Sequence, residues 1–217
     1  VRRLITENVS CLHDYSLQTN QMKAIEQAEL VVISGAGLEE FLEDALNRVQ
    51  HIADASEGLH LEESHHHDHG QEAGHVHEED PHIWLSPENA KAMAKNICEH
   101  LISLYPQHRK VLENNLLQLL KDLDTLQLYG EEKLADLSSR DLITFHDGFT
   151  YLAESFDLHI IRAVEEESGS EASAAELIHL ITIVNDHDLP AIFTEKSGSV
   201  SAAGIIARET GCSSFAL

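Results

Sequence analysis

Residues 173–211 read SAAELIHLITIVNDHDLPAIFTEKSGSVSAAGIIARETG, and this stretch decides the fold class. Ser173 and Glu176 stand three positions apart ahead of an apolar periodicity, which is the signature of a capping box at a helix start. A short apolar run at 190–194 then predicts a strand, and residues 199–210 predict a helix that a glycine ends. Strands alternating with helices are typical of a mainly parallel sheet.

The same alternation continues upstream. Apolar runs at 141–145 and 159–164 predict two more strands. Near the start of the chain, residues 18–28 predict a helix and residues 29–34 a buried strand. After a glycine-containing turn comes an apolar stripe at helical spacing, which predicts a second helix. The stripe consists of Leu38, Phe41, Leu42, Ala45, Leu46 and Val49.

A helical centre separates these two α/β parts. Ser86 followed by Pro87 is a good N-cap and first helical residue, and this helix is expected to reach about Leu104. Helix resumes at Pro106. Leucines then recur at spacings of four and three, at Leu112, Leu116, Leu119, Leu123 and Leu126. This stripe fits a coiled-coil seam, but Gly130 and the short run favour a helix packed across one protein.

We therefore predict an α/β fold with two lobes, each with a mainly parallel sheet, joined by a long helix. The expected domains are an N-terminal lobe at 1–104 that includes a histidine-rich loop at 58–80, a linking helix at 105–138, and an incomplete C-terminal lobe at 139–217. The chain opens with VRRLITENVS, which has no signal-peptide anatomy, and stops at SSFAL, which reads like an unfinished strand. We expect a chain truncated at both ends.

Charge and cysteine content exclude several classes of function. A net charge of −24 over 217 residues argues against nucleic-acid binding, which relies on clustered Lys and Arg. Cys11, Cys98 and Cys212 are scattered, so they predict neither a disulfide framework nor a cysteine-rich zinc site. Gly35-Ala36-Gly37 after a strand lacks the third glycine of a dinucleotide loop, because position 40 is Glu.

Half of the chain's 16 histidines fall between His60 and His82, in HLEESHHHDHGQEAGHVHEEDPH. Acidic residues are interleaved with them, and no Lys or Arg occurs between Gln50 and Ala90. Such a segment buries too little apolar surface to fold alone, and it attracts divalent cations. We interpret it as a native metal-attracting loop whose auxiliary ligands are His65, His66, His67, His69, His75 and His77.

Three other histidines stand where a regular element meets a loop. His13 follows an extended region, His82 lies at the exit of the loop, and His146 directly follows a predicted strand. Ligands of open α/β sheets bind beyond the carboxyl ends of strands, so these positions are candidates for a site. Asp14 and Asp147, beside two of them, are interpreted as groups that orient backbone or imidazole.

The short motifs around these three histidines resemble the signatures of a known protein family. HDYSL at His13, DPHIWLSP around His82 and HDGFTYL from His146 resemble, in order, the signatures of metal-binding substrate-binding proteins of ABC importers. The zinc-specific branch, which usually carries a histidine-rich acidic loop, is the most similar. The resemblance covers nearly the whole chain.

This resemblance implies that His13 and His82 in the first lobe, and His146 in the second, hold Zn²⁺ in the cleft between lobes. Three imidazoles leave one tetrahedral position open. Relatives place an aspartate ligand shortly after the position where this chain stops, so the fourth ligand is either outside it or replaced by water. Glu195, after a second-lobe strand, is a candidate for the second shell or fourth ligand.

The implied function is extracytoplasmic capture of zinc and its delivery to the permease of an ABC importer, without catalysis. Membrane association would then come only through a missing anchor or through the permease. One alternative is the same fold serving manganese or another divalent metal, although His146 stands where the manganese branch has a carboxylate. A distant alternative is a zinc hydrolase, since three histidines and an open position also describe catalytic zinc. No HExxH motif supports it.

Overall fold

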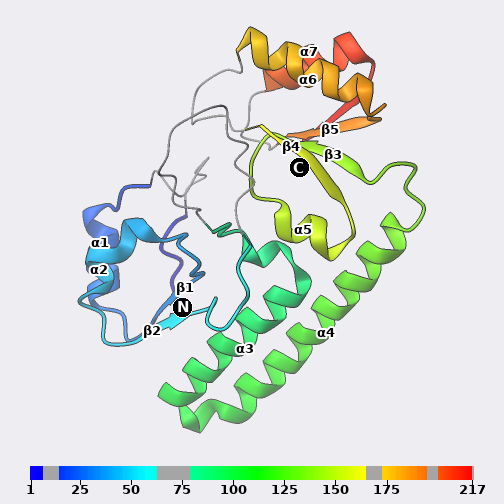
Figure 1. Ribbon diagram of the computed structural model, residues 1–217. Helices are drawn as coiled ribbons and strands as arrows, with labels where there is room; N and C mark the ends of the chain where they lie inside the picture. Colours follow the sequence, from blue (N-terminus) through cyan, green and yellow to red (C-terminus); the bar gives the residue numbers. More distant parts are fainter. Residues whose placement is uncertain (7–14, 63–78, 165–172, 195–199, 217) are drawn as a thin grey trace. The chain divides into compact units, whose positions relative to one another are not determined.

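The computed structural model describes residues 1–6, 15–62, 79–164, 173–194 and 200–216 (Figure 1). The chain divides into two compact units. The described residues of the first are 1–6, 15–62 and 79–130, and those of the second begin at Glu131. Each unit is α/β with parallel strand pairing, and one long helix passes from the first unit into the second, as predicted for the fold class.

The first unit begins with a small parallel sheet. α1 (Thr19–Glu26) precedes β1 (Val31–Ile33), and both lie within the predicted helix and strand. β1 pairs in parallel with β2 (Ile52–Asp54), a strand that the sequence analysis missed because three residues carry too little periodicity.

Between these strands the predicted helix is much shorter than expected. Only a 3-10 turn at Glu40–Leu42 and a single helical turn, α2 (Glu43–Leu46), form there. The apolar stripe still serves the core, since Leu42 and Ala45 are buried against Ile25 of α1.

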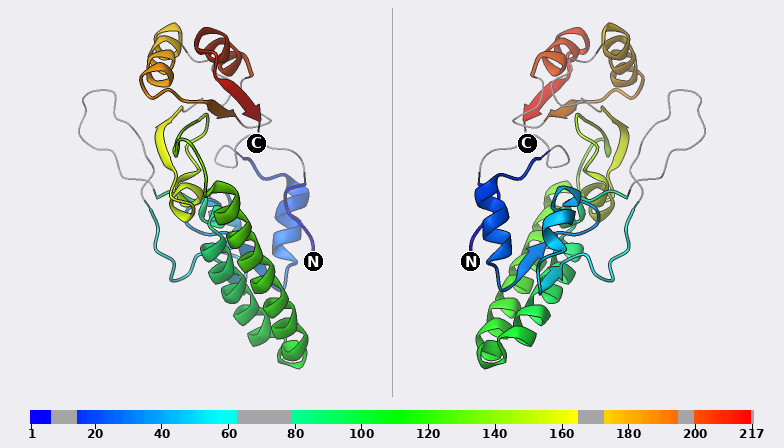
Figure 2. Two further views of the ribbon diagram at one scale, coloured as in Figure 1. Left: turned by 90° about the vertical axis from the view of Figure 1, so that its right-hand side faces the viewer. Right: turned by 90° about the vertical axis from the view of Figure 1, so that its left-hand side faces the viewer.

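The helical centre begins at the predicted cap. After a 3-10 turn at Ile83–Leu85, α3 spans Pro87–Leu104, and the Ser86 hydroxyl accepts a hydrogen bond from the Asn89 N–H at 3.3 Å. A 3-10 turn at Pro106–His108 then leads into α4 (Arg109–Leu134). α3 and α4 lie side by side in both views of Figure 2, and Lys91 bonds to Asp124 between them at 2.8 Å.

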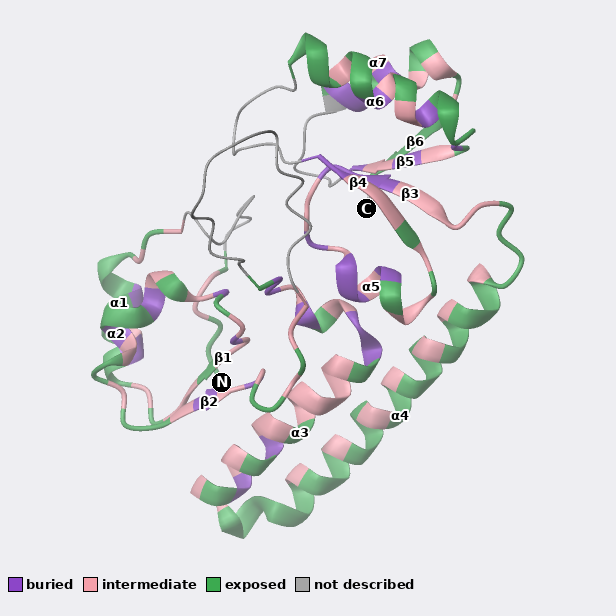
Figure 3. Cartoon of the chain, in the orientation of Figure 1, coloured by how far each residue is buried: buried purple, intermediate pink, exposed green. Residues whose placement is uncertain are grey.

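The apolar face of α4 differs from the predicted leucine stripe. No residue of α4 is fully buried (Figure 3), and Leu119 and Leu126 are 46% and 51% exposed. The half-buried positions are instead 112, 116, 120, 123, 127, 130 and 134. The predicted stripe has the 3.5-residue period of a coiled coil, whereas an α-helix has 3.6 residues per turn and drifts from that period along its length.

The second unit holds a four-stranded parallel sheet in the order β4-β3-β5-β6. Its strands are β3 (Asp141–Thr144), β4 (His159–Ala163), β5 (Ala191–Thr194) and β6 (Ser213–Ala216). Its helices are α5 (Thr150–Ser155), α6 (Ala174–Asp186) and α7 (Val200–Thr210). The sequence analysis did not predict α5.

The core of this unit lies between the sheet and the pair α6 and α7, which run together over it (Figure 1). Ile143 and Ile192 from the sheet are at most 1% exposed, as is Ile206 from α7. The predicted capping box at Ser173 and Glu176 forms in both directions at the start of α6. Parallel strands place all their carboxyl ends at one edge of the sheet, and that edge is where ligands of such folds bind.

Candidate metal centre

His82 lies on a rigid turn at the start of α3. Its carbonyl accepts the N–H of Leu85 at 3.1 Å, and Ile83, the next residue, is fully buried. The side chain of His82 is 13% exposed, and its ring lies 5.3 Å from that of Trp84, centroid to centroid. The helix cap at Ser86 follows directly, so the backbone that carries this imidazole has little freedom.

A buried carboxylate orients the His82 ring. Asp80 is 1% exposed, and its Oδ1 accepts the backbone N–H of His82 at 2.9 Å and lies 2.7 Å from the ring Nδ1. Because an ionised carboxylate only accepts, Nδ1 carries the proton and Nε2 keeps its lone pair. A carboxylate that fixes the tautomer in this way is the usual partner of a metal-binding histidine.

The sequence analysis missed this role of Asp80. It assigned orientation to Asp14, which lies outside the described residues, and to Asp147, which is partly buried beside His146. The available signal was an aspartate two positions before a histidine, since such a side chain readily accepts the backbone N–H two residues on.

Asp80 also closes the stem of the histidine-rich segment. Its backbone N–H donates to the carbonyl of Glu62 at 2.8 Å, so residues on either side of the segment are joined. Residues 58–62 and 79–80 of the predicted loop are described, and the loop histidines (His65, His66, His67, His69, His75 and His77) lie outside the described residues. The two described ends of this segment therefore meet two residues before His82.

His146 lies beyond the carboxyl end of β3, as predicted. β3 ends at Thr144, and the partly buried His146 occupies the bend between this strand and α5. β5 is the neighbour of β3, with Thr144 paired to Phe193, and Glu195 follows the last residue of β5 in sequence. Glu195 and His13 lie outside the described residues.

His82 belongs to the first unit and His146 to the second. Within the described ranges, no three His, Cys, Asp or Glu side chains already form a group able to hold a metal ion. None of the described helices is long and apolar enough to cross a membrane.

Three backbone N–H groups of the glycine loop after β1 already have side-chain acceptors. The carboxylate of Glu39 accepts the N–H groups of Ser34 and Gly35 at 2.7 and 3.0 Å, and the Ala36 N–H donates to the Ser56 hydroxyl at 3.1 Å. Burial raises the pKa of Glu39 above its ordinary 4.5, and the Asp54 charge adds to the rise, whereas the two N–H donors oppose it. These hydrogen bonds attach the loop to side chains of the same unit, which agrees with the exclusion of a dinucleotide site.

Comparisons with known proteins identify the family of the chain. A family model described as the periplasmic component A of the zinc-uptake complex matches residues 1–217. The chain is 29% identical over 208 residues to zinc-binding lipoprotein AdcA of Streptococcus pneumoniae, covering 92% of this chain and 41% of the relative. It is 28% identical over 207 residues to the high-affinity zinc uptake system protein ZnuA of Bacillus subtilis, covering 92% and 65%.

A solved crystal structure of ZnuA superposes with a TM-score of 0.81 at 31% identity, covering 95% of this chain and 78% of the other. The chain thus spans less than two thirds of the length of the two curated relatives.

Proposed function

Because the chain belongs to the family of periplasmic A components of zinc-uptake complexes, we propose that it captures zinc outside the cytoplasmic membrane and delivers it to the permease of an ABC importer. Zinc is the cargo in this function, so the protein has to hold the ion selectively and then release it. The observation that carries the proposal is the Asp80–His82 pair, a buried carboxylate holding an imidazole in the tautomer that binds a metal through Nε2.

We propose that His13, His82 and His146 are the three protein nitrogen ligands. His82 has the tautomer and the rigid backbone that a ligand requires, and His146 lies at the ligand-binding edge of its parallel sheet. His13 is assigned as the third ligand on the basis of its sequence motif alone. Three neutral imidazoles suit zinc better than manganese, which prefers oxygen ligands, so zinc is the favoured cargo over manganese.

The fourth position goes to Glu195 or to water. The strand pairing supports Glu195, because β3 and β5 are parallel neighbours and their carboxyl ends leave the sheet at the same edge. Thr194, the last residue of β5, is therefore at the edge of the sheet beyond which His146 lies. Glu195 serves either as the ligand or as a hydrogen-bond partner of one.

The lobes of this receptor are residues 1–104 and 139–217, joined by the helical segment 105–138. In this proposal the loop histidines collect zinc weakly, and the hydrogen bond from the Asp80 N–H to the Glu62 carbonyl joins the two described ends of their segment. Excision of 63–78 is then expected to lower the zinc stoichiometry and to leave the tight site intact.

The protein is a carrier in this proposal, and it catalyses no reaction. Asp80, the carboxylate next to His82, is occupied in holding the ring and the backbone, so it does not act as a general base on a metal-bound water. Metal-dependent turnover of an ester or peptide by the purified chain would support the hydrolase alternative instead.

Competitive titration of zinc and manganese against a chelator of known affinity tests the proposal. The parent is expected to bind one zinc tightly and manganese at least tenfold more weakly. His146→Ala deletes one of three nitrogen ligands and is expected to abolish tight binding. His100→Ala is a matched control, because His100 is a partly exposed imidazole that lies 3.7 Å from Glu57 in the first unit. Parent-like zinc affinity in His146→Ala would refute the ligand assignment, and tighter manganese binding in the parent would refute the choice of cargo.

A further inference from the structure

Trp84, the only tryptophan of the chain, lies beside the proposed ligand His82. The centroids of the two rings are 5.3 Å apart, and their planes are inclined at 54°. The two residues flank Ile83, which is fully buried and begins the 3-10 turn that precedes α3. The ring contact is therefore made within a short stretch of backbone that the core holds in place.

The indole is not what holds this turn to the first unit. Trp84 is 39% exposed, whereas Ile83 and the capping residue Ser86 are both buried. A residue that keeps this much of its surface in water contributes less to stability than a buried one of the same kind. What the indole does cover is the neighbouring imidazole.

Asp80 and Trp84 restrain the imidazole in different ways. Asp80 Oδ1 lies 2.7 Å from Nδ1, so the carboxylate acts at one edge of the ring. A hydrogen bond to such an oxygen tolerates a broad range of angles, and on its own it resists tilting of the ring only weakly. The indole packs against the ring itself and opposes this tilt. The two contacts together fix the direction in which Nε2 points.

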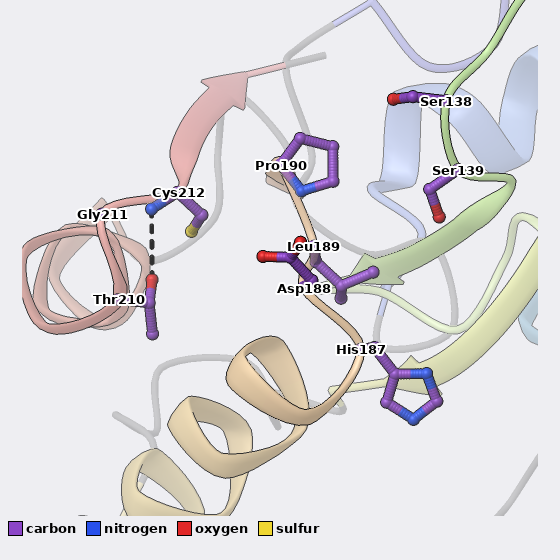
Figure 4. Close-up of a pocket in the computed structure, with 9 residues that line it drawn as sticks. All are labelled: Ser138, Ser139, His187, Asp188, Leu189, Pro190, Thr210, Gly211 and Cys212. Carbon is purple, nitrogen blue, oxygen red and sulfur yellow. Dashed lines mark hydrogen bonds between the residues drawn. The ribbon is translucent and has the colours of Figure 1, made fainter.

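A histidine of the second unit shows an imidazole that meets a carboxylate without an indole beside it. Nδ1 of His187 lies 3.5 Å from Asp141 Oδ2, and its side chain is 43% exposed, against 13% for His82. Figure 4 shows the His187 ring at a hollow of about 520 Å³, and no Phe, Tyr or Trp is among the described residues that line it. A carboxylate at Nδ1 does not by itself cover or restrain an imidazole.

We propose that Trp84 is a positioning residue of the zinc site, which fixes the tilt of the His82 imidazole and stabilises its zinc-bound form. This inference rests on the proposed function and adds a residue to the same site. A bound zinc ion is a large local charge, so the imidazole that holds it becomes more positive. The face of an indole attracts positive charge within about 6 Å of its centroid, and the His82 ring is inside that range. The contact is thus stronger with zinc bound, and it slows release of the ion.

Zinc affinity from chelator competition, and the zinc release rate from stopped-flow transfer to a chelator, test the proposal on the 217-residue chain. Trp84→Ala is expected to weaken zinc binding by about three- to tenfold, the loss that corresponds to one aromatic contact, mainly through faster release. Trp84→Phe keeps an aromatic ring and is expected to restore the affinity to within about twofold of the parent. Trp84→Leu keeps apolar bulk without a π face and is expected to behave like Trp84→Ala.

Two controls separate positioning from a purely structural role. Leu119→Ala removes an apolar side chain of similar exposure, 46%, from α4 and is expected to leave zinc affinity unchanged. Urea midpoints of the metal-free Trp84→Ala and Leu119→Ala chains should be alike. In a His82→Ala background, Trp84→Ala is expected to have no effect on the residual zinc affinity, because the indole acts through that ring. Trp84 emission should also change during a zinc titration, with the midpoint of the tight site.

The alternative is that the exposed indole is only a contact for another protein, in which case Trp84→Ala binds and releases zinc like the parent. That result would overturn the proposal. So would an equal loss of affinity with and without His82, or a loss in Trp84→Ala and Trp84→Leu that a fall in metal-free stability accounts for. A parent without a tight zinc site would refute the proposed function and this inference with it. A parent with a tight site that Trp84→Ala leaves unchanged would refute this inference alone.

Discussion

Replacing Asp80 isolates the contribution of a single buried carboxylate to zinc affinity. Asp80→Ala removes both the acceptor of the His82 ring proton at 2.7 Å and the acceptor of the His82 backbone N–H at 2.9 Å. Loss of such an orienting partner usually weakens metal binding by about 10–100-fold. Since each tenfold change is about 1.4 kcal/mol, the expected loss of binding free energy is about 1.4–2.8 kcal/mol.

The same substitution also affects stability, and Asp80→Asn separates the two effects. Asp80→Ala leaves a buried N–H without its acceptor, which costs about 1–3 kcal/mol of unfolding free energy. Asp80→Asn keeps an oxygen for the backbone and loses only the charge, so we expect about a tenfold weaker zinc affinity with a smaller loss of stability.

Chelator competition gives the Kd for zinc, and urea unfolding of the metal-free chain gives the stability. Glu79→Gln is the matched control, because Glu79 is an exposed carboxylate next to Asp80 in sequence. It removes the same charge from the same segment without touching His82. Zinc affinity in Asp80→Ala within twofold of the parent would refute the reasoning, and an equal loss in Glu79→Gln would show that net charge, rather than orientation, sets the affinity.

Two further predictions concern the loop after β1. A Cβ at Gly35 would overlap the carboxylate of Asp54 and the Ser56 hydroxyl, at a φ of +84°. Gly35→Ala is thus expected to lower the unfolding free energy by more than about 2 kcal/mol. Gly58→Ala is the control: Gly58 has φ +75° and no atom within 4 Å of an added Cβ, so this change costs only the backbone strain of about 1–2 kcal/mol. Equal urea midpoints in the two variants would contradict this prediction. The raised pKa of Glu39 means that its stabilising effect is present below about pH 4.5 and is lost as pH rises through the folded-state pKa. The unfolding free energy of the parent minus that of Glu39→Gln should therefore fall with rising pH. A difference that does not change with pH would contradict this prediction, as would the same trend in the control Glu40→Gln, which replaces an exposed carboxylate.

Features that depend on neighbouring residues could be predicted from the sequence alone. The cap at Ser86 and the capping box at Ser173 each join groups three residues apart, and both helices begin where those residues predict. The strand and helix alternation identified the parallel sheet of the second unit, because periodicity reports which side of an element is buried. The histidine motifs likewise indicated the family, which the match over residues 1–217 confirms.

Features that depend on contacts between distant residues were decided by the tertiary structure. The Glu39 and Ser56 side chains that occupy the glycine loop come from opposite sides of β2, and Ser56 lies 20 residues from the Ala36 N–H that it binds. His159 and Asp141 are 18 residues apart and meet only because their strands pair at the first position of each.

The histidines on either side of the second sheet show the same division. From the sequence, His146 was interpreted as a ligand because its motif follows a predicted strand. His159 and His187 were interpreted as structural or solvated, because no neighbouring residue distinguishes them. A sequence motif consists of consecutive residues, so it can be recognised without knowledge of the fold. The contacts of Asp141 with His159 and His187 are instead produced by strand register and by the position of a helix end, which depend on how the whole core of the unit packs.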